Sequence, residues 1–128
     1  MNLSIEALEK TKLIGKAALD KKADNIVILD MRAVSNITDY FVICSASSNT
    51  RVQAVSEGIE EELLKNGLRH WHIEGKREAL WVLIDYGDVI AHVFHNKTRK
   101  FYDLERLWYD APKEHFSLSC ISLKSKKN

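Results

Sequence analysis

A chain of 128 residues, 45% hydrophobic and 29% charged, is long enough for one domain with a single core and has the composition of an ordinary globular protein. Its net charge of +1 argues against a broad nucleic-acid-binding surface, which needs a basic body. Four lysines and one glutamate follow Pro112, so the basic character is concentrated at the C-terminal end and the rest is slightly acidic.

The first elements expected along the chain are a helix and two strands. Apolar residues recur at helical spacing over residues 3–20. Apolar, β-rich runs at residues 25–31 and 40–44 indicate strands, and the residues between them, 35–39, are typical of a turn.

A second helix is expected over residues 50–65, ended by Gly67. Its buried stripe consists of Val52, Val55, Ile59 and Leu63, with Leu64 as a further candidate. A third strand is expected at residues 68–73, and a short last helix at 104–109. The sequence predicts that the chain is loosely held after Pro112, which gives one domain over residues 1–112 and a basic, flexible tail over 113–128.

Residues 80–95 indicate two strands joined at Tyr86-Gly87, with two faces of different character. One face is wholly aliphatic and suits a core: Leu80, Val82, Ile84, Val89, Ala91 and Val93. The other face mixes aromatic, aliphatic, acidic and imidazole side chains: Trp81, Leu83, Asp85, Asp88, Ile90, His92 and Phe94. This second face is a candidate surface for a partner.

The order of these elements predicts an α/β fold, a two-layer sandwich with a mixed sheet of about five strands and flanking helices. If the helices cover mainly one face of the sheet, the other face is exposed or occupied by a partner. The two-faced hairpin therefore bears directly on function.

Asp85 and Asp88 allow two interpretations. They are expected to lie nearly opposite each other, where like charges are mildly destabilising. Both could simply be solvated turn carboxylates. Alternatively, with Trp81 and His92 beside them, they could form a socket for a lysine or arginine of a partner, because tryptophan contributes strongly to binding at interfaces.

The sequence gives little support for a catalytic, metal or phosphate site. His92 and His95 point to opposite faces of one strand, and His70 and His72 have no nearby third ligand. Ser45 to Thr50 precede a helix but lack the phosphate-loop glycines and lysine. No nucleophile-elbow pattern surrounds Cys44 or Ser45, so we expect no enzyme activity, no metal and no cofactor.

The two cysteines, Cys44 and Cys120, are far apart in sequence and do not suggest a disulfide framework. The N-terminus lacks the pattern of a secretory signal, and no apolar run approaches the length of a membrane span. These features predict a cytoplasmic protein that does not contact membranes.

Six segments of the chain closely resemble the ribosomal silencing factor family, also called Iojap-related. The segments follow the order and spacing of the family: residues 39–45, 51–55, 74–75, 81–94, 102–108 and 110–112. Two features depart from it. Ala46 stands where the family often has glycine, and the tail after Pro112 matches no motif of the family.

The resemblance implies a translational repressor rather than an enzyme. It implies binding to the large ribosomal subunit through its fourteenth protein, a steric block to joining with the small subunit, and a homodimer in the free state. It also implies a nucleotidyltransferase-like fold, which leaves a nucleotidyltransferase-like enzyme or a nucleotide-binding protein as the alternative. That alternative is weakened because no Asp-x-Asp pair for magnesium occurs in the chain.

Combining the resemblance with the hairpin, we predict that the partner-binding surface contains Trp81, Asp85, Tyr86, Asp88 and His92. We expect the lysine-rich tail to make a secondary, salt-dependent contact with ribosomal RNA.

Overall fold

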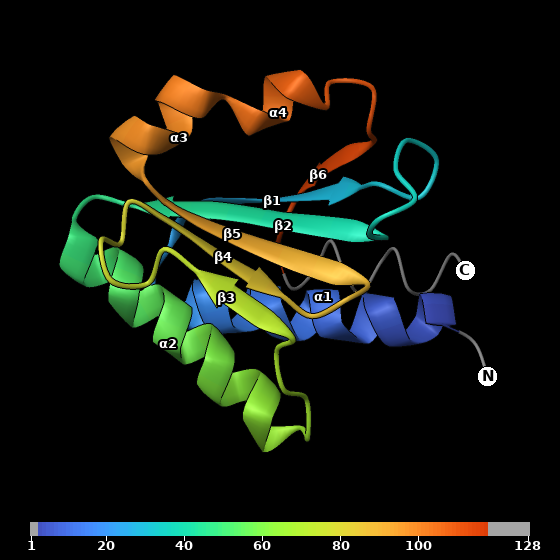
Figure 1. The fold of residues 1–128 in the computed structure, drawn as a ribbon, viewed down its shortest axis with the longest axis horizontal. Helices are drawn as coiled ribbons and strands as arrows, with labels where there is room; N and C mark the ends of the chain where they lie inside the picture. Colours follow the sequence, from blue (N-terminus) through green and yellow to red (C-terminus); the bar gives the residue numbers. More distant parts are fainter. Residues whose placement is uncertain (1–2, 118–128) are drawn as a thin grey trace.

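The computed structural model describes residues 3–117, with side chains from residue 6 onward (Figure 1). In chain order the elements are α1 (Leu3–Asp20), β1 (Asp24–Asp30), β2 (Tyr40–Ala46), α2 (Asn49–Lys65), β3 (His72–Glu74), β4 (Trp81–Asp85), β5 (Val89–His95), α3 (Asn96–Tyr102), α4 (Leu104–Leu107) and β6 (Lys113–His115).

The strands form one mixed sheet in the order β3-β4-β5-β2-β1-β6. The central pair, β2 and β5, is parallel, and the other pairs are antiparallel. The predicted α/β class with a mixed sheet is confirmed. The described residues contain six strands rather than about five because β6 was not expected.

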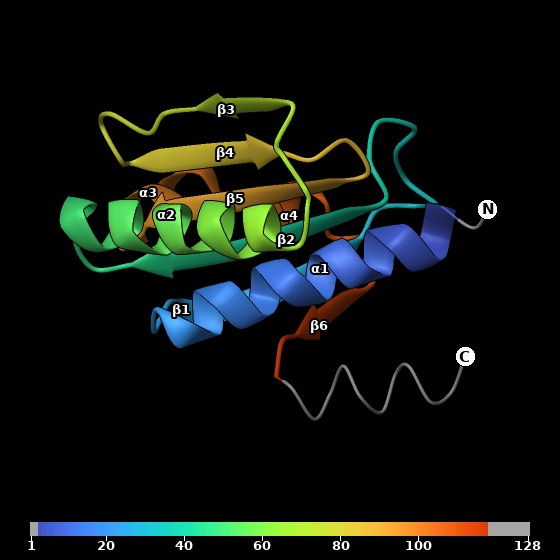
Figure 2. The same cartoon turned by 90° about the horizontal axis from the view of Figure 1, so that it is seen from below.

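Helices lie on both sides of the sheet, but unequally. The long helices α1 and α2 cover one face, and the short helices α3 and α4 lie over the other (Figures 1 and 2). Each face has its own apolar cluster, one packed under α1 and α2 and a smaller one that includes Leu104 of α4. The expected two layers are therefore present, and α3 and α4 add a partial third layer.

The sequence explains the limits of α2. Ser48 accepts a hydrogen bond from the amide of Arg51 at 3.2 Å and so caps the first turn. Gly67 follows the helix with φ of +77°, a conformation that suits glycine. The predicted stripe is buried except for Leu64, which is exposed and does not belong to the core.

The prediction that the chain is loosely held from residue 113 is wrong for residues 113–116. Lys113–His115 form β6, an edge strand paired antiparallel with β1. The amide of Phe116 donates to the carbonyl of Ile26 at 2.8 Å, and the Phe116 ring is 8% exposed against the helices' side of the sheet. The domain therefore includes residues 113–116, and the remaining tail prediction, for residues 118–128, lies outside the described residues.

The β4–β5 hairpin has the predicted faces but a different turn. Asp85 pairs with Ile90, and the amide of Tyr86 donates to the carbonyl of Val89 at 2.9 Å. Gly87 and Asp88 are thus the central turn residues, and Gly87 has φ of +91°. The shift moves the pairing by two residues, which preserves the assignment of side chains to faces.

Candidate functional site

The two faces of the hairpin differ as predicted. Val82, Ile84, Val89, Ala91 and Val93 belong to the cluster under α1 and α2. Ile90 and Phe94 belong to the cluster on the other face, with Trp81 and Leu83 packed against it. Leu80, assigned to the aliphatic core face, instead precedes β4 and is 47% exposed.

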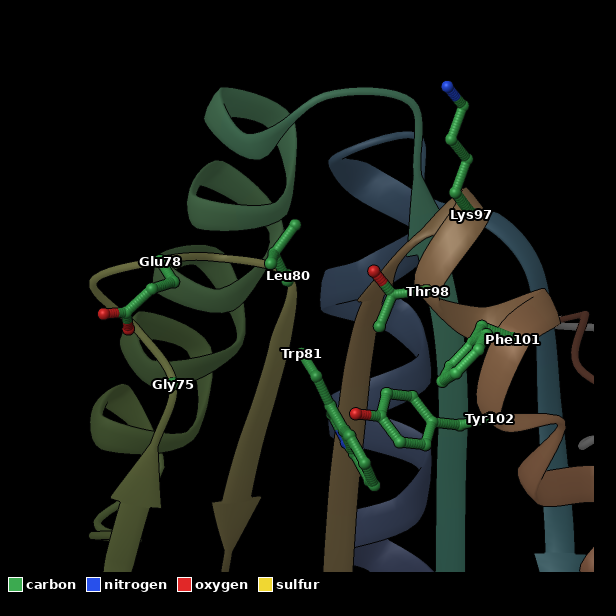
Figure 3. A pocket seen from close by; sticks show the side chains of 8 residues that line it. All are labelled: Gly75, Glu78, Leu80, Trp81, Lys97, Thr98, Phe101 and Tyr102. Carbon is green, nitrogen blue, oxygen red and sulfur yellow. The ribbon is translucent and has the colours of Figure 1, made fainter.

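A groove of about 610 Å³ opens between the start of β4 and helix α3. Its lining is formed by Gly75, Glu78, Leu80, Trp81, Lys97, Thr98, Phe101 and Tyr102 (Figure 3). In Figure 3 the Tyr102 ring faces the Trp81 indole, whereas the charged ends of Glu78 and Lys97 point away from these rings. The groove is therefore mainly apolar and aromatic in its centre, with charges at its rim.

Trp81 is held between the sheet and α3. Its ring stacks on Phe94 with centroids 4.8 Å apart, and the Tyr102 ring lies 4.9 Å away. The indole nitrogen donates a hydrogen bond to Nδ1 of His92 at 3.1 Å. These contacts leave Trp81 partly exposed as a wall of the groove.

Exposed apolar side chains continue from the lining of the groove onto α4 and the residues that follow it. We call the following set the aromatic surface: Leu80, Phe101, Tyr102, Leu107 and Tyr109. Phe101 is 80% exposed and Tyr109 84% exposed. Large apolar side chains gathered on one surface are typical of a protein interaction site, whereas single ones are not informative.

An ion pair holds the two short helices in place. The Arg99 guanidinium on α3 donates from Nε and Nη2 to the two carboxylate oxygens of Glu105 on α4, at 3.2 and 3.1 Å. Its third nitrogen, Nη1, donates to Oγ of Ser45 at the end of β2. Arg99 is buried, so this bidentate pair anchors α3 and α4 to the sheet.

The predicted carboxylate socket is not formed. Asp88 lies in the turn and makes an ion pair of 2.8 Å with Nζ of Lys10 on α1, on the side of the long helices. Asp85 accepts a hydrogen bond from the amide of Gly87 at 2.7 Å. Because Trp81 begins β4 and Asp85 ends it, the hairpin does not bring these acids beside the indole.

Two other predicted contact residues are buried. Tyr86 is 2% exposed in the cluster under the long helices, and burial raises the pKa of its phenol. His92 is 3% exposed, and burial lowers its pKa to about 3, so the imidazole is neutral at pH 7. Of the five predicted residues, Trp81 alone lines the groove.

The sequence did not assign Phe101 or Tyr102 to the partner-binding surface, because no helix was expected at Asn96–Tyr102; Tyr102 appeared only as the first residue of the family-like segment 102–108. In the structure His95 caps this helix by accepting from the amide of Lys97. The sequence signal was the pair of adjacent aromatic residues in its last turn.

Within residues 3–117 no group of three or more His, Cys, Asp or Glu side chains is arranged to hold a metal ion. In the same part of the chain, no helix is long and apolar enough to cross a membrane.

Comparisons with known proteins agree on one family. Residues 4–128 match the family described as "Ribosomal silencing factor during starvation". The chain is 46% identical over 101 residues to the ribosomal silencing factor RsfS of Bacillus subtilis, covering 79% of this chain and 86% of that protein. It is 32% identical to the chloroplastic Iojap protein of Zea mays over 83% of this chain and 46% of that protein.

Solved structures share the fold. A crystal structure of a protein from Bacillus halodurans has a TM-score of 0.74 and 36% identity, covering 90% of this chain and all of that one. A protein from Chromobacterium violaceum has a TM-score of 0.79 and 30% identity, covering 91% and 93% of the two chains. With the family match spanning nearly the whole sequence, this chain belongs to the ribosomal silencing factor family.

Proposed function

We propose that this protein represses translation by binding the large ribosomal subunit through its fourteenth protein and blocking, by its bulk, association with the small subunit. Family membership supports the general role, a ribosome-associated regulator of translation. The choice of subunit, ribosomal protein and steric mechanism is the proposal.

The observation that carries the proposal is the groove between β4 and α3 with the aromatic surface beside it. Interface centres are enriched in aromatic residues and depleted of charge, and charged groups gather at the rim. The groove has this arrangement, since Trp81, Phe101 and Tyr102 line it while Glu78 and Lys97 point outward (Figure 3).

This surface revises the chemistry expected of the contact. The sequence suggested acids that receive a basic side chain, but Asp88 is already paired with Lys10. We therefore propose that apolar burial in the groove supplies most of the binding free energy. Charges at its rim then affect mainly the association rate and its salt dependence.

The proposed role needs only binding and steric exclusion, so no catalytic group takes part in it. The place of action is the cytoplasm, where the subunits are joined. A homodimer of the free protein is a further part of the proposal, and sedimentation equilibrium at several concentrations tests it.

The test is a subunit-joining assay. Purified protein is added to separated ribosomal subunits, and joined ribosomes are followed by sedimentation. We expect fewer joined ribosomes with the native protein and recovery of joining with a Phe101→Ala/Tyr102→Ala variant. Trp71→Ala is the matched control because Trp71 is also an exposed aromatic residue, at 78%, but does not line the groove. Undiminished joining despite bound native protein would refute the steric mechanism.

A secondary contact with ribosomal RNA is also proposed for the lysines near the C-terminus, Lys124, Lys126 and Lys127. Lysines that neutralise phosphates release counterions, so their contribution weakens as salt rises. A chain ending at Ser117 should bind large subunits less tightly, mainly at low salt. Equal affinity of the two chains at every salt concentration would argue against the RNA contact.

A further inference from the structure

His92 is a polar side chain in an aromatic, water-excluded position. It lies in the middle of β5 on the face opposite the long helices and is 3% exposed. The Phe41 ring lies edge-on to it with centroids 4.5 Å apart, and the Phe94 ring is 6.2 Å away. These surroundings would suit an aliphatic or aromatic side chain.

Only one of the two ring nitrogens of His92 has a hydrogen-bond partner. Because Nδ1 accepts the bond from Trp81, the ring proton of the neutral imidazole is on Nε2. This Nε2 is buried and has no hydrogen-bond partner. A buried donor without a partner costs free energy, so an imidazole at this position does not serve the stability of the domain well. Buried polar groups that break this rule occur at functional sites.

The one polar interaction of His92 is with the groove. In the β4–β5 pairing Trp81 lies opposite Phe94, and His92 lies opposite Leu83, so the indole reaches diagonally along the sheet to Nδ1. Phe94 and Tyr102 contact the Trp81 ring, and the bond to His92 fixes the direction of its nitrogen edge. The rotation of the indole that forms the groove wall is thus fixed by His92.

We propose that His92 is a positioning residue for partner binding: its Nδ1 holds Trp81 in the orientation that shapes the groove, and His92 itself does not touch the partner. The inference rests on the proposed function. It assigns His92 a role through Trp81 in place of the direct contact expected from the sequence. A groove wall that is already ordered loses less conformational freedom on binding, which strengthens affinity.

Two substitutions separate positioning from structural support. His92→Leu removes both the acceptor and the unpaired donor, so the thermal midpoint should stay close to native or rise while the indole loses its partner. His92→Asn places an amide oxygen where Nδ1 lies, so it should keep the indole bond but destabilise the domain through its unpaired amide. His92→Leu should therefore lose the indole hydrogen bond and keep its thermal midpoint, whereas His92→Asn should keep the bond and have a lower midpoint.

The direct readout is the indole N–H signal of Trp81 in ¹⁵N NMR spectra of the free protein. Trp71→Phe and Trp108→Phe variants assign the three indole signals. We expect slow hydrogen exchange of the Trp81 indole in the native protein and in His92→Asn, and faster exchange in His92→Leu. Protection that persists in His92→Leu would overturn the proposal.

Cosedimentation with isolated large subunits then tests the consequence. Without the bond, the indole must be fixed when the partner binds, at a cost no larger than that of one neutral hydrogen bond. We therefore expect about three- to tenfold weaker binding for His92→Leu and native binding for His92→Asn. A native protein that does not bind large subunits contradicts the proposed function. Native binding together with equal binding by His92→Leu contradicts only the role of His92.

Discussion

The C-terminal strand β6 and Phe116 should be essential for folding, although the sequence alone suggested a dispensable tail. Truncation after Pro112 removes β6 and the Phe116 ring, which is 8% exposed. Loss of a buried phenylalanine side chain costs about 3–5 kcal/mol. A small domain has a total stability of about 5–15 kcal/mol, so this truncation removes a large part of it.

The assay is urea unfolding followed by circular dichroism. We expect a chain ending at Pro112 to be largely unfolded or to have a much lower midpoint, and a chain ending at Ser117 to match the full chain. Phe116→Ala in the full chain should account for most of the difference. Equal midpoints for the chain ending at Pro112 and the full chain would show that β6 and Phe116 do not stabilise the domain.

Gly15 on α1 provides an internal check on the same contact. A Cβ at Gly15 would lie 2.5 Å from a carbon of the Phe116 ring, so Gly15→Ala should destabilise the native chain. In a Phe116→Ala background the clash disappears, and alanine gains about 1 kcal/mol over glycine in a helix. Gly15→Ala should then stabilise the domain. Destabilisation of equal size in both backgrounds would show that the two residues are not coupled.

Three further predictions concern buried or paired groups. Burial lowers the pKa of His92 to about 3 from 6.5, so the unfolded chain binds an extra proton between these values. The free energy of unfolding should fall as pH decreases from about 6.5, by up to about 1.4 kcal/mol per pH unit from this group. The acid dependence should be shallower in His92→Leu, and identical profiles by urea titration at each pH would contradict the assignment. Lys10→Ala and Asp88→Asn should each lower the free energy of unfolding by about 1 kcal/mol without weakening large-subunit binding, because their 2.8 Å ion pair anchors the hairpin turn. Loss of large-subunit binding in Asp88→Asn would support the interpretation that Asp85 and Asp88 receive a basic side chain of the partner. Burial raises the pKa of the Cys44 thiol to about 12, so in a Cys120→Ser variant a thiol reagent at neutral pH should react only after unfolding. Rapid reaction of the folded variant would show that Cys44 is accessible.

Side-chain alternation made the two faces of the hairpin predictable from sequence. Successive strand residues point to opposite faces, so the assignment survives a two-residue error in the turn. The same alternation places Tyr86 with Val82 and Ile84 on the core face, where the structure has it. The sequence prediction had instead placed Tyr86 at the junction of the two strands and on the partner-binding surface.

Other features depended on contacts that no local pattern shows. The ion pair between Lys10 and Asp88 joins residues 78 positions apart, and it decides whether the turn acid is free for a partner. β6 has three residues, which is too short for a periodic pattern in the sequence. It is a strand because it pairs with β1. α3 has seven residues and, among its side chains, only Arg99 is buried, so it lacks the apolar stripe that reveals longer helices.

The proposed function requires that the groove and the aromatic surface bind the large subunit. The most direct measurement is cosedimentation of the Phe101→Ala/Tyr102→Ala variant with isolated large subunits, compared with native protein and Trp71→Ala. Circular dichroism first checks that each variant is folded. Aromatic residues central to an interface typically contribute about 2 kcal/mol or more each, so binding should fall about thirtyfold for each residue and several hundredfold in the double variant where the two contributions add. Trp71→Ala should bind as the native protein does. Native affinity in the folded double variant would show that the groove and the aromatic surface do not bind the large subunit.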